Sequence, residues 1–448
     1  MTTLSLLGIV VGLVLLMFLA YRGYSIIWVA PVCAVVVAVF GGYAILDAYI
    51  GDYMAGMANY VLQWFPAFFL GAVYGKVMDM TGSARSLGNA LVNLIGSRFA
   101  VAAVVIPCLL MTYGGISLFV VVFVIYPMGY SIYRAADLPR TLLPGAIATG
   151  AFGITMTAVP GTPQIQNMIP TQYYGTDAMA APLLSIVACI VMLVPAYLYL
   201  EWRAHQARRR GLHFIPDPKH KEVNHDEKGL PSWHWVTGIV PLVVVVLMLN
   251  LFPRLLEQHA GIALESNQSI VIALVCGIIA ACLLNLNQFK ILLPAINEGA
   301  NGSMGAIMNT ACAVGFGSVV QVVPGFTTLT NIALNMPGSI LFSEAIAVNL
   351  LAGATGSASG GMSIALSALG PQYAEMAAGN TNILEALHRI ASISSGGLDT
   401  LPHNGAVLTL LAVSNCTHKE SYIDICITTC IIPLVSSLAL ALIWGLFI

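Results

Sequence analysis

Long apolar runs recur along the whole chain and are separated by short polar interruptions. A bilayer core about 30 Å thick needs about 20 apolar residues in one helix, and several runs approach that length. They are Leu4–Leu19, Ile26–Ala44, Met57–Val73, Ser117–Ile132, Pro182–Leu200, Trp235–Leu251, Ile270–Leu286 and Ile423–Leu446. Between them lie shorter apolar segments broken by Gly, Pro, Ser, Thr and Asn. The pattern predicts an all-α polytopic membrane protein with about 10–12 full spans and several half-length pieces.

Composition supports this class. Of 448 residues, 58% are hydrophobic and 8% are charged, against about a quarter charged in soluble domains. The net charge of −2 gives no reason to expect a nucleic-acid partner. The nine cysteines are scattered in apolar runs without metal-ligand spacing, so they are interpreted as small buried hydrophobes. Neither a metal nor a cofactor is expected.

One polar segment divides the chain. Residues Glu201 to Ser232 hold seven of the 17 Lys and Arg residues, including the run Arg208–Arg210. By the positive-inside rule this segment is cytoplasmic. A solvated linker is the interpretation, with a histidine-rich metal site as the alternative. The predicted organisation is a first membrane repeat over 1–200, a cytoplasmic linker over 201–232 and a second membrane repeat over 233–448.

Three pairs of motifs recur in the same order at an offset of about 240 residues. The pairs are Gly82–Leu91 with Gly325–Leu334, Thr112–Phe119 with Ser357–Leu366, and Ala158–Asn167 with Ser394–Ala406. Three matches in register indicate a duplicated unit. No basic residue precedes the first span and Arg22 follows it, so the first copy is expected to begin outside the cytoplasm. The second copy begins at the cytoplasmic linker, which predicts an inverted repeat.

The repeated motifs are rich in Gly, Pro and hydroxyl residues although they lie between apolar segments. Non-helical backbone in a membrane is tolerated only against protein or a wet cavity, so the motifs predict re-entrant helical hairpins and broken helices. Helix amino termini at such tips suit a carboxylate. The predicted substrate-binding residues are Tyr113, Gly114, Gly115, Ser117, Thr162, Gln164, Ser357, Ser359, Gly360, Gly361, Ser363, Thr400, His403 and Asn404. Close helix packing is the alternative role of such small residues.

Ionisable residues in apolar segments are usually functional. Asp399 and His403 flank Leu401-Pro402, and either could carry a proton, since an imidazole titrates near neutral pH. His403 could instead donate to a substrate carboxylate or bond to a tip carbonyl. Glu344 is read as either a buried carboxylate or a helix-start cap. The group His418, Lys419, Glu420 and Asp424 is read as an exposed charged turn. No nucleophile motif of an enzyme is present in the sequence.

With these motifs the chain resembles the gluconate permease (GntP) family of the ion-transporter superfamily. The stretches that carry the resemblance are Thr112–Met128, Ala354–Leu366, Ser395–Val407 and Thr417–Asp424. The long signatures GSASGGMS and GLDTLPHNGA are most similar to the branch of bacterial D-3-hydroxybutyrate permeases. The resemblance implies proton-coupled uptake at the bacterial inner (cytoplasmic) membrane. It also implies a scaffold domain that forms a homodimer and a transport domain that carries the hairpins and moves as an elevator.

The resulting hypothesis is a proton symporter that imports a short-chain hydroxy-carboxylate, with D-3-hydroxybutyrate as the substrate. Three rivals stay open at this point. They are a permease for gluconate or another sugar acid, a sodium-coupled carboxylate carrier, and an anion channel. The expected partners are the organic anion, protons, the lipid bilayer and a second copy of the chain.

Overall fold

The computed structural model describes residues 2–84, 86–87, 90, 97–113, 118–162, 164–217, 233–262, 264, 266–334, 339–377 and 379–446. Within these residues the secondary structure is helical, and no strand occurs. Five helices are long and apolar enough to cross a membrane: Thr3–Tyr21, Asp47–Met80, Pro182–Arg209, Leu286–Val322 and His418–Trp444. Six shorter apolar helices accompany them. The expected all-α membrane protein is confirmed.

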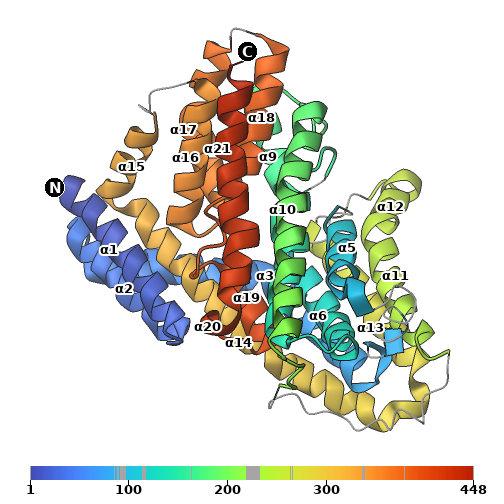
Figure 1. The fold of residues 1–448 in the computed structure, drawn as a ribbon. Coiled ribbons are helices and arrows are strands. Elements are labelled where there is room, and N and C mark those ends of the chain that lie inside the picture. Colours follow the sequence, from blue (N-terminus) through green and yellow to red (C-terminus); the bar gives the residue numbers. More distant parts are fainter. Residues whose placement is uncertain are drawn as a thin grey trace.

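The helices form two series of similar order, one before and one after residues 210–235, and Figure 1 colours them in chain order. The first series is α1 (Thr2–Tyr21), α2 (Ile26–Gly41), η1 (Asp47–Tyr53), α3 (Met54–Met80), η2 (Ser97–Phe99), α5 (Ala100–Tyr113), α6 (Leu118–Ala135), η3 (Arg140–Leu142), α7 (Leu143–Ala148), η4 (Thr149–Ile154), α8 (Thr155–Thr157), α9 (Ile165–Tyr174) and α10 (Pro182–Arg209). The second is α11 (Val236–Asn250), α12 (Phe252–Ala260), α13 (Ser266–Leu284), η5 (Leu286–Gln288), α14 (Phe289–Val322), α15 (Pro324–Leu334), α16 (Ile340–Thr355), α17 (Ala358–Met376), α18 (Thr381–Ser395), α19 (Gly405–Ser414), α20 (His418–Cys426), η6 (Ile427–Ile431) and α21 (Ile432–Trp444). Each series contains a long helix, a pair of shorter helices, a broken helix and a final apolar helix.

The long helices α3 and α14 pack side by side in antiparallel directions. Glycines make this approach possible, because a Cβ at Gly299 would lie 2.6 Å from the Cα of Val73. Near the other end of the contact, a Cβ at Gly315 would lie 2.8 Å from the carbonyl oxygen of Tyr53. Small residues between helices let backbones approach and gain dispersion contacts in a membrane. The two long helices therefore form a close pair, with α2 packed on α14 and α13 packed on α3.

A helical hairpin is formed by α16 and α17. Its turn is Gly356, whose φ of 64° lies in the left-handed region that glycine adopts without steric cost. Ser357 then caps α17, because its hydroxyl accepts a hydrogen bond from the Gly360 N–H over 3.1 Å. A Cβ at Gly361 would lie 2.3 Å from the Cα of Ala352. The Gly-Gly motif thus lets the two legs of the hairpin touch.

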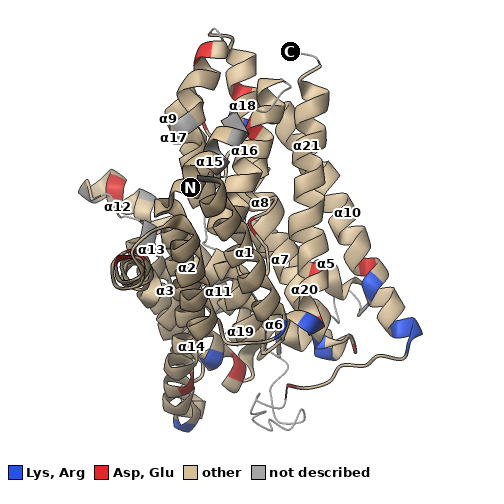
Figure 2. Cartoon of the chain, turned by 90° about the vertical axis from the view of Figure 1, so that its left-hand side faces the viewer, with Lys and Arg blue, Asp and Glu red and all other residues tan. Residues whose placement is uncertain are grey.

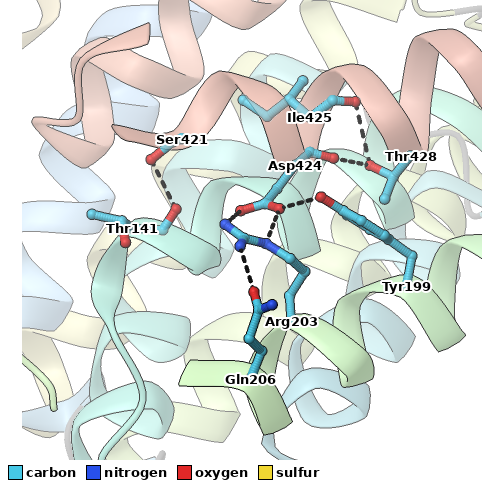
Figure 3. Close-up of polar contacts among 8 residues, drawn as sticks. All are labelled: Thr141, Tyr199, Arg203, Gln206, Ser421, Asp424, Ile425 and Thr428. Carbon is cyan, nitrogen blue, oxygen red and sulfur yellow. Dashed lines mark hydrogen bonds and ion pairs between the residues drawn. The ribbon is translucent and has the colours of Figure 1, made fainter. Parts of the chain in front are cut away.

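A buried ion pair joins α10 to α20 (Figure 3). Nε of Arg203 lies 2.6 Å from Oδ1 of Asp424, Nη2 lies 3.2 Å from Oδ2, and the Tyr199 hydroxyl donates to Oδ1 over 2.7 Å. Asp424 is 0% exposed and His418 is 8% exposed. The reading of this segment as an exposed charged turn is therefore wrong for these two residues. Lys419 and Glu420 are exposed, as predicted. Asp424 is buried because a guanidinium from a distant helix neutralises its carboxylate.

The segment after α10 folds back on the turn that follows α6. His213 Nδ1 lies 2.6 Å from Oδ2 of Asp137, and the Phe214 N–H donates to Oδ1 over 3.0 Å. Both bonds favour the ionised carboxylate and lower the pKa of Asp137. Helix α10 itself continues to Arg209, inside the segment predicted as the linker, and residues 218–232 of that segment lie outside the described residues.

Lys and Arg residues gather at the end of the molecule where α10 ends (Figure 2). The last turn of α10 carries Arg208 and Arg209. The positive-inside rule favours this end as the cytoplasmic one.

Candidate functional site

The second broken helix is interrupted between the end of α18 at Ser395 and the start of α19 at Gly405. Asn404 organises this break. Its Oδ1 accepts from the backbone N–H groups of Ala406 and Val407 over 2.7 and 3.1 Å, which caps α19. Its Nδ2 donates to the Gly356 carbonyl over 3.0 Å and to Asp399 Oδ1 over 2.8 Å. One side chain therefore ties the break to the turn of the hairpin.

Asp399 lies at the amino terminus of α17. Its Oδ1 accepts from Asn404 Nδ2, which also donates to the Gly356 carbonyl of the hairpin turn, and the side chain is 4% exposed. A carboxylate at a helix amino terminus is stabilised by the free N–H groups and the helix dipole. Asp399 thus occupies the kind of position that the sequence analysis assigned to the carboxylate of a substrate.

His403 lies against the hairpin turn and is 1% exposed. A Cβ at Gly356 would be 3.0 Å from its Nε2. Its ring meets Phe316 of α14 edge-on, with centroids 6.4 Å apart and an interplanar angle of 77°. Within the described residues neither ring nitrogen has a hydrogen-bond partner. A buried polar group without a partner is costly and is typical of a group that meets water or a ligand.

The first broken helix repeats this arrangement in simpler form. Its break lies between α8 and α9, and Gln164, which stands 240 residues before Asn404, donates from Nε2 to the Thr112 carbonyl over 2.8 Å. The hydroxyls of Thr112 and Thr162 are buried, and in the described part of the chain they have no partner. Tyr113 is half exposed beside Gly161. In both series a side-chain amide therefore joins the break to a neighbouring segment: Gln164 to Thr112 in the first and Asn404 to Gly356 in the second.

The two broken helices contact each other next to their breaks. The Ser392 hydroxyl at the end of α18 donates to the Thr157 carbonyl at the end of α8 over 2.7 Å. A Cβ at Gly396 would lie 3.1 Å from Cγ2 of Thr157. In addition, α17 packs against α9 and α6 packs against α19. A site shared by the two breaks stays a prediction.

Other predicted site residues have different surroundings. Thr400 is buried against η6 and α20, where its hydroxyl accepts from Thr429 over 2.9 Å and its carbonyl accepts from the Tyr422 hydroxyl over 3.0 Å. Ser357 caps α17, and Gly361 packs inside the hairpin. Three further residues, half-buried on α17, are Ser359, Gly360 and Ser363. Those outside the described residues are Gly114, Gly115 and Ser117.

A buried polar cluster behind the first break was not anticipated. Arg389 and His388 of α18 both bond to Oδ1 of Asn167, over 2.9 and 3.1 Å. Asn167 Nδ2 donates to the Thr162 carbonyl over 2.8 Å. A charged residue inside an apolar segment is the sequence signal that could have identified this cluster. Arg389, however, lies outside the Gly- and Pro-rich motifs from which the site was predicted.

Glu344 is a buried carboxylate rather than a helix-start cap. It is 0% exposed inside α16, and the Tyr174 hydroxyl of α9 donates to its Oε1. Oε2 has no partner among the described residues. Ser339 instead caps α16, since its hydroxyl accepts from the Phe342 N–H over 3.3 Å.

A cavity of about 240 Å³ lies between α3, α6, α14 and α19. One lining residue, Val413, lies nine residues after Asn404, toward the opposite end of α19. Its wall includes Lys76, which lies 3.5 Å from Glu298 and 3.8 Å from Asp79. The volume is below the ~300–1,000 Å³ of sites for drug-sized ligands, so the cavity suits a small solute.

Comparisons with known proteins place this geometry in context. A profile of the GntP family permease matches residues 4–398. The uncharacterized transporter YxjC of Bacillus subtilis (strain 168) is 39% identical over 449 residues, covering 94% of this chain and 95% of YxjC. The solved structure of Neisseria gonorrhoeae MtrF, reported with a class of antimetabolite efflux pumps, is 14% identical with a TM-score of 0.37, covering 90% of this chain and 86% of that chain. The last likeness is too distant to support an argument.

Proposed function

Because this chain belongs to the GntP permease family, we propose that it is a proton-coupled carrier that imports a short-chain hydroxy-carboxylate. The family and the 39% identical transporter make it a multi-pass membrane transporter and not an enzyme. The observation that carries the proposal is the contact between the two broken helices, together with buried polar groups next to the breaks that have no partner among the described residues. These groups are the hydroxyls of Thr112 and Thr162 and the ring of His403.

The described residues offer partners for a small substrate. Two buried threonine hydroxyls and one imidazole that have no partner there suit one carboxylate and one hydroxyl. A sugar acid would bring several more hydroxyls, and each would need a partner on leaving water. Half-buried Leu401, two residues before His403, adds an apolar neighbour. We therefore propose D-3-hydroxybutyrate as the substrate, with gluconate as the rival to be tested.

Proton coupling is proposed to act through Asp399 and His403. Asp399 lies beside the amino terminus of α17, where its ionised form would interact favourably with the free N–H groups. Protonation would remove that interaction and leave the helix terminus to the carboxylate of the substrate. Because the proton neutralises Asp399 as the anion binds, the net charge of the site would not change. His403, beside the same turn, is the candidate to deliver or retain that proton.

The architecture proposed for transport is an inverted repeat with a scaffold and a moving domain. The order of helices that occurs twice supports the repeat, as do the matching contacts of α17 with α9 and of α6 with α19. The scaffold would contain α1–α3, α11, α13 and α14, and the hairpins and broken helices would slide against it as an elevator. A homodimer in the bacterial inner membrane completes the proposal.

Counterflow in proteoliposomes tests the carrier and its substrate. Vesicles loaded with unlabelled D-3-hydroxybutyrate should transiently accumulate the labelled compound, and external gluconate should compete weakly. A channel shows no counterflow, and its current grows with voltage in unitary steps. Strong competition by gluconate with none by D-3-hydroxybutyrate would replace the substrate but retain the carrier.

A further inference from the structure

Arg389 is the one lysine or arginine in the described part of the chain that is fully buried, with a side chain 0% exposed. It lies in α18, about two helical turns before the break that begins after Ser395. A charge in a membrane-embedded segment is costly to retain and usually has a function. Arg389 takes no part in the proton coupling proposed for Asp399 and His403.

Only neutral groups bind the guanidinium within the described residues. Nη1 donates to Asn167 Oδ1 over 2.9 Å, and Nη2 donates to the carbonyls of Ala180 and Ala178 over 3.1 and 3.3 Å. Glu385 stands one turn earlier on α18, but its Oε2 accepts from the Ala181 N–H over 2.9 Å. No ion pair links Glu385 to Arg389 among the described residues. The positive charge is therefore left without an anionic partner there.

The neighbouring histidine does not add to this charge. Asn167 has a fixed orientation, because its Nδ2 donates to the carbonyls of Thr162 and Ala178 over 2.8 and 2.9 Å. Its Oδ1 can only accept, so the proton of His388 is on Nε2. Nδ1 of the same ring lies 2.7 Å from the Thr176 hydroxyl, which can donate to it. Burial and the adjacent Arg389 guanidinium both favour a neutral imidazole, so Arg389 supplies the positive charge of the cluster.

Two hydrogen bonds connect the guanidinium to the site. One joins Arg389 to Asn167, and the other joins Asn167 to the carbonyl of Thr162. The Thr162 hydroxyl is one of the unpartnered groups at the first break. If Arg389 served only to hold the loop carbonyls of Ala178 and Ala180, a neutral donor could do so at a lower cost of desolvation.

We propose that Arg389 is the fixed positive charge that makes the site at the two breaks select anions, and that Asn167 positions it behind Thr162. The inference rests on the proposed function, since it names how the same site recognises the charge of its substrate. A charge in a low-dielectric interior acts over several ångströms without direct contact. Arg389 is thus a specificity-determining, positioning residue that need not touch the substrate.

The test compares an anion with its neutral analogue. Uptake of labelled D-3-hydroxybutyrate into proteoliposomes is competed with unlabelled D-3-hydroxybutyrate and with neutral 3-hydroxybutyramide. Arg389→Gln should reduce the preference for the anion by about ten-fold or more, while Arg389→Lys should retain most of it. His388→Gln is the matched control, because it alters a bond to the same Asn167 oxygen without removing a charge.

A second variant covers the case in which Arg389→Gln does not fold. Asn167→Asp keeps the guanidinium and sets a carboxylate beside it, so it should also reduce the preference for the anion. Wild-type preference in the folded Arg389→Gln or Asn167→Asp variant would overturn the inference and leave the proposed function intact. Equal losses in Arg389→Gln, Arg389→Lys and His388→Gln would show a structural clamp and overturn it too. A wild-type protein that does not prefer the anion to the amide would overturn both.

Discussion

At the scale of single residues, His403 combines burial with an unpartnered ring. It is 1% exposed between the hairpin turn and Phe316, and neither nitrogen has a partner among the described residues. His403→Ala should abolish accumulation driven by a pH gradient, because the proposed proton carrier is lost, while exchange across the membrane continues more slowly. Exposed His213→Ala is the control. Normal proton-driven uptake by His403→Ala would remove this residue from the mechanism.

Tyr174 supports a different buried group. Its hydroxyl is the one described partner of the Glu344 carboxylate, so Tyr174→Phe leaves a buried acid unsatisfied. We expect the free energy of unfolding in detergent to fall by about 1–3 kcal/mol. Tyr173→Phe is the neighbouring control, since the Tyr173 ring packs on Gly370. Equal stability of the Tyr174 and Tyr173 variants would contradict a structural role for the bond to Glu344.

The sequence predicts residues within a motif better than contacts between distant segments. Asp399, His403 and Asn404 were predicted as site residues, and the hairpin turn meets all three. Thr400, from the same motif, bonds to η6 instead. This direction could not be predicted, because a non-helical segment has no periodicity to show which way a side chain points. The burial of Asp424 could not be predicted, because its partner Arg203 is separated by 221 residues.

At the scale of elements, α14 offers a matched pair of glycines for testing the cavity. Gly302 lines the cavity, and a Cβ there would meet no atom within 4 Å. A Cβ at Gly305 would also meet nothing, but Gly305 is not among the lining residues. If the cavity is the cytoplasmic access to the site, Gly302→Leu should slow transport several-fold and Gly305→Leu should leave it near wild type. Equal rates would exclude the cavity from the path.

The sequence predicts the apolar helices and the two breaks, but it does not predict how consecutive helical segments are joined. Glycine and proline marked the two breaks, because they interrupt helices for known steric reasons. The π-helical turns η1, η4 and η6 had no such signal, since residues of ordinary helical segments form them. The end of α10 at Arg209 also lies beyond the predicted boundary, because a charged surface helix continues an apolar one without a breaking residue.

At the scale of the whole molecule, the elevator proposal requires α19 to move against α14. The Thr310 and Thr409 hydroxyls of these helices lie 2.8 Å apart. In a background without native cysteines, Thr310→Cys with Thr409→Cys should block transport on oxidation and recover on reduction. Ser83→Cys with Thr237→Cys is the control within the proposed scaffold, where the hydroxyls are also 2.8 Å apart. Full transport by the oxidised Thr310–Thr409 pair would rule out sliding at this contact.

The central claim is that the site at the two breaks couples a short hydroxy-carboxylate to protons. It is tested most directly by uptake of labelled D-3-hydroxybutyrate into proteoliposomes of the purified protein, under an imposed pH gradient and separately under a sodium gradient. The account predicts concentrative uptake driven by inward protons alone, which a protonophore abolishes. Accumulation driven by the sodium gradient alone would contradict the account. So would the failure of any carboxylate to accumulate under either gradient.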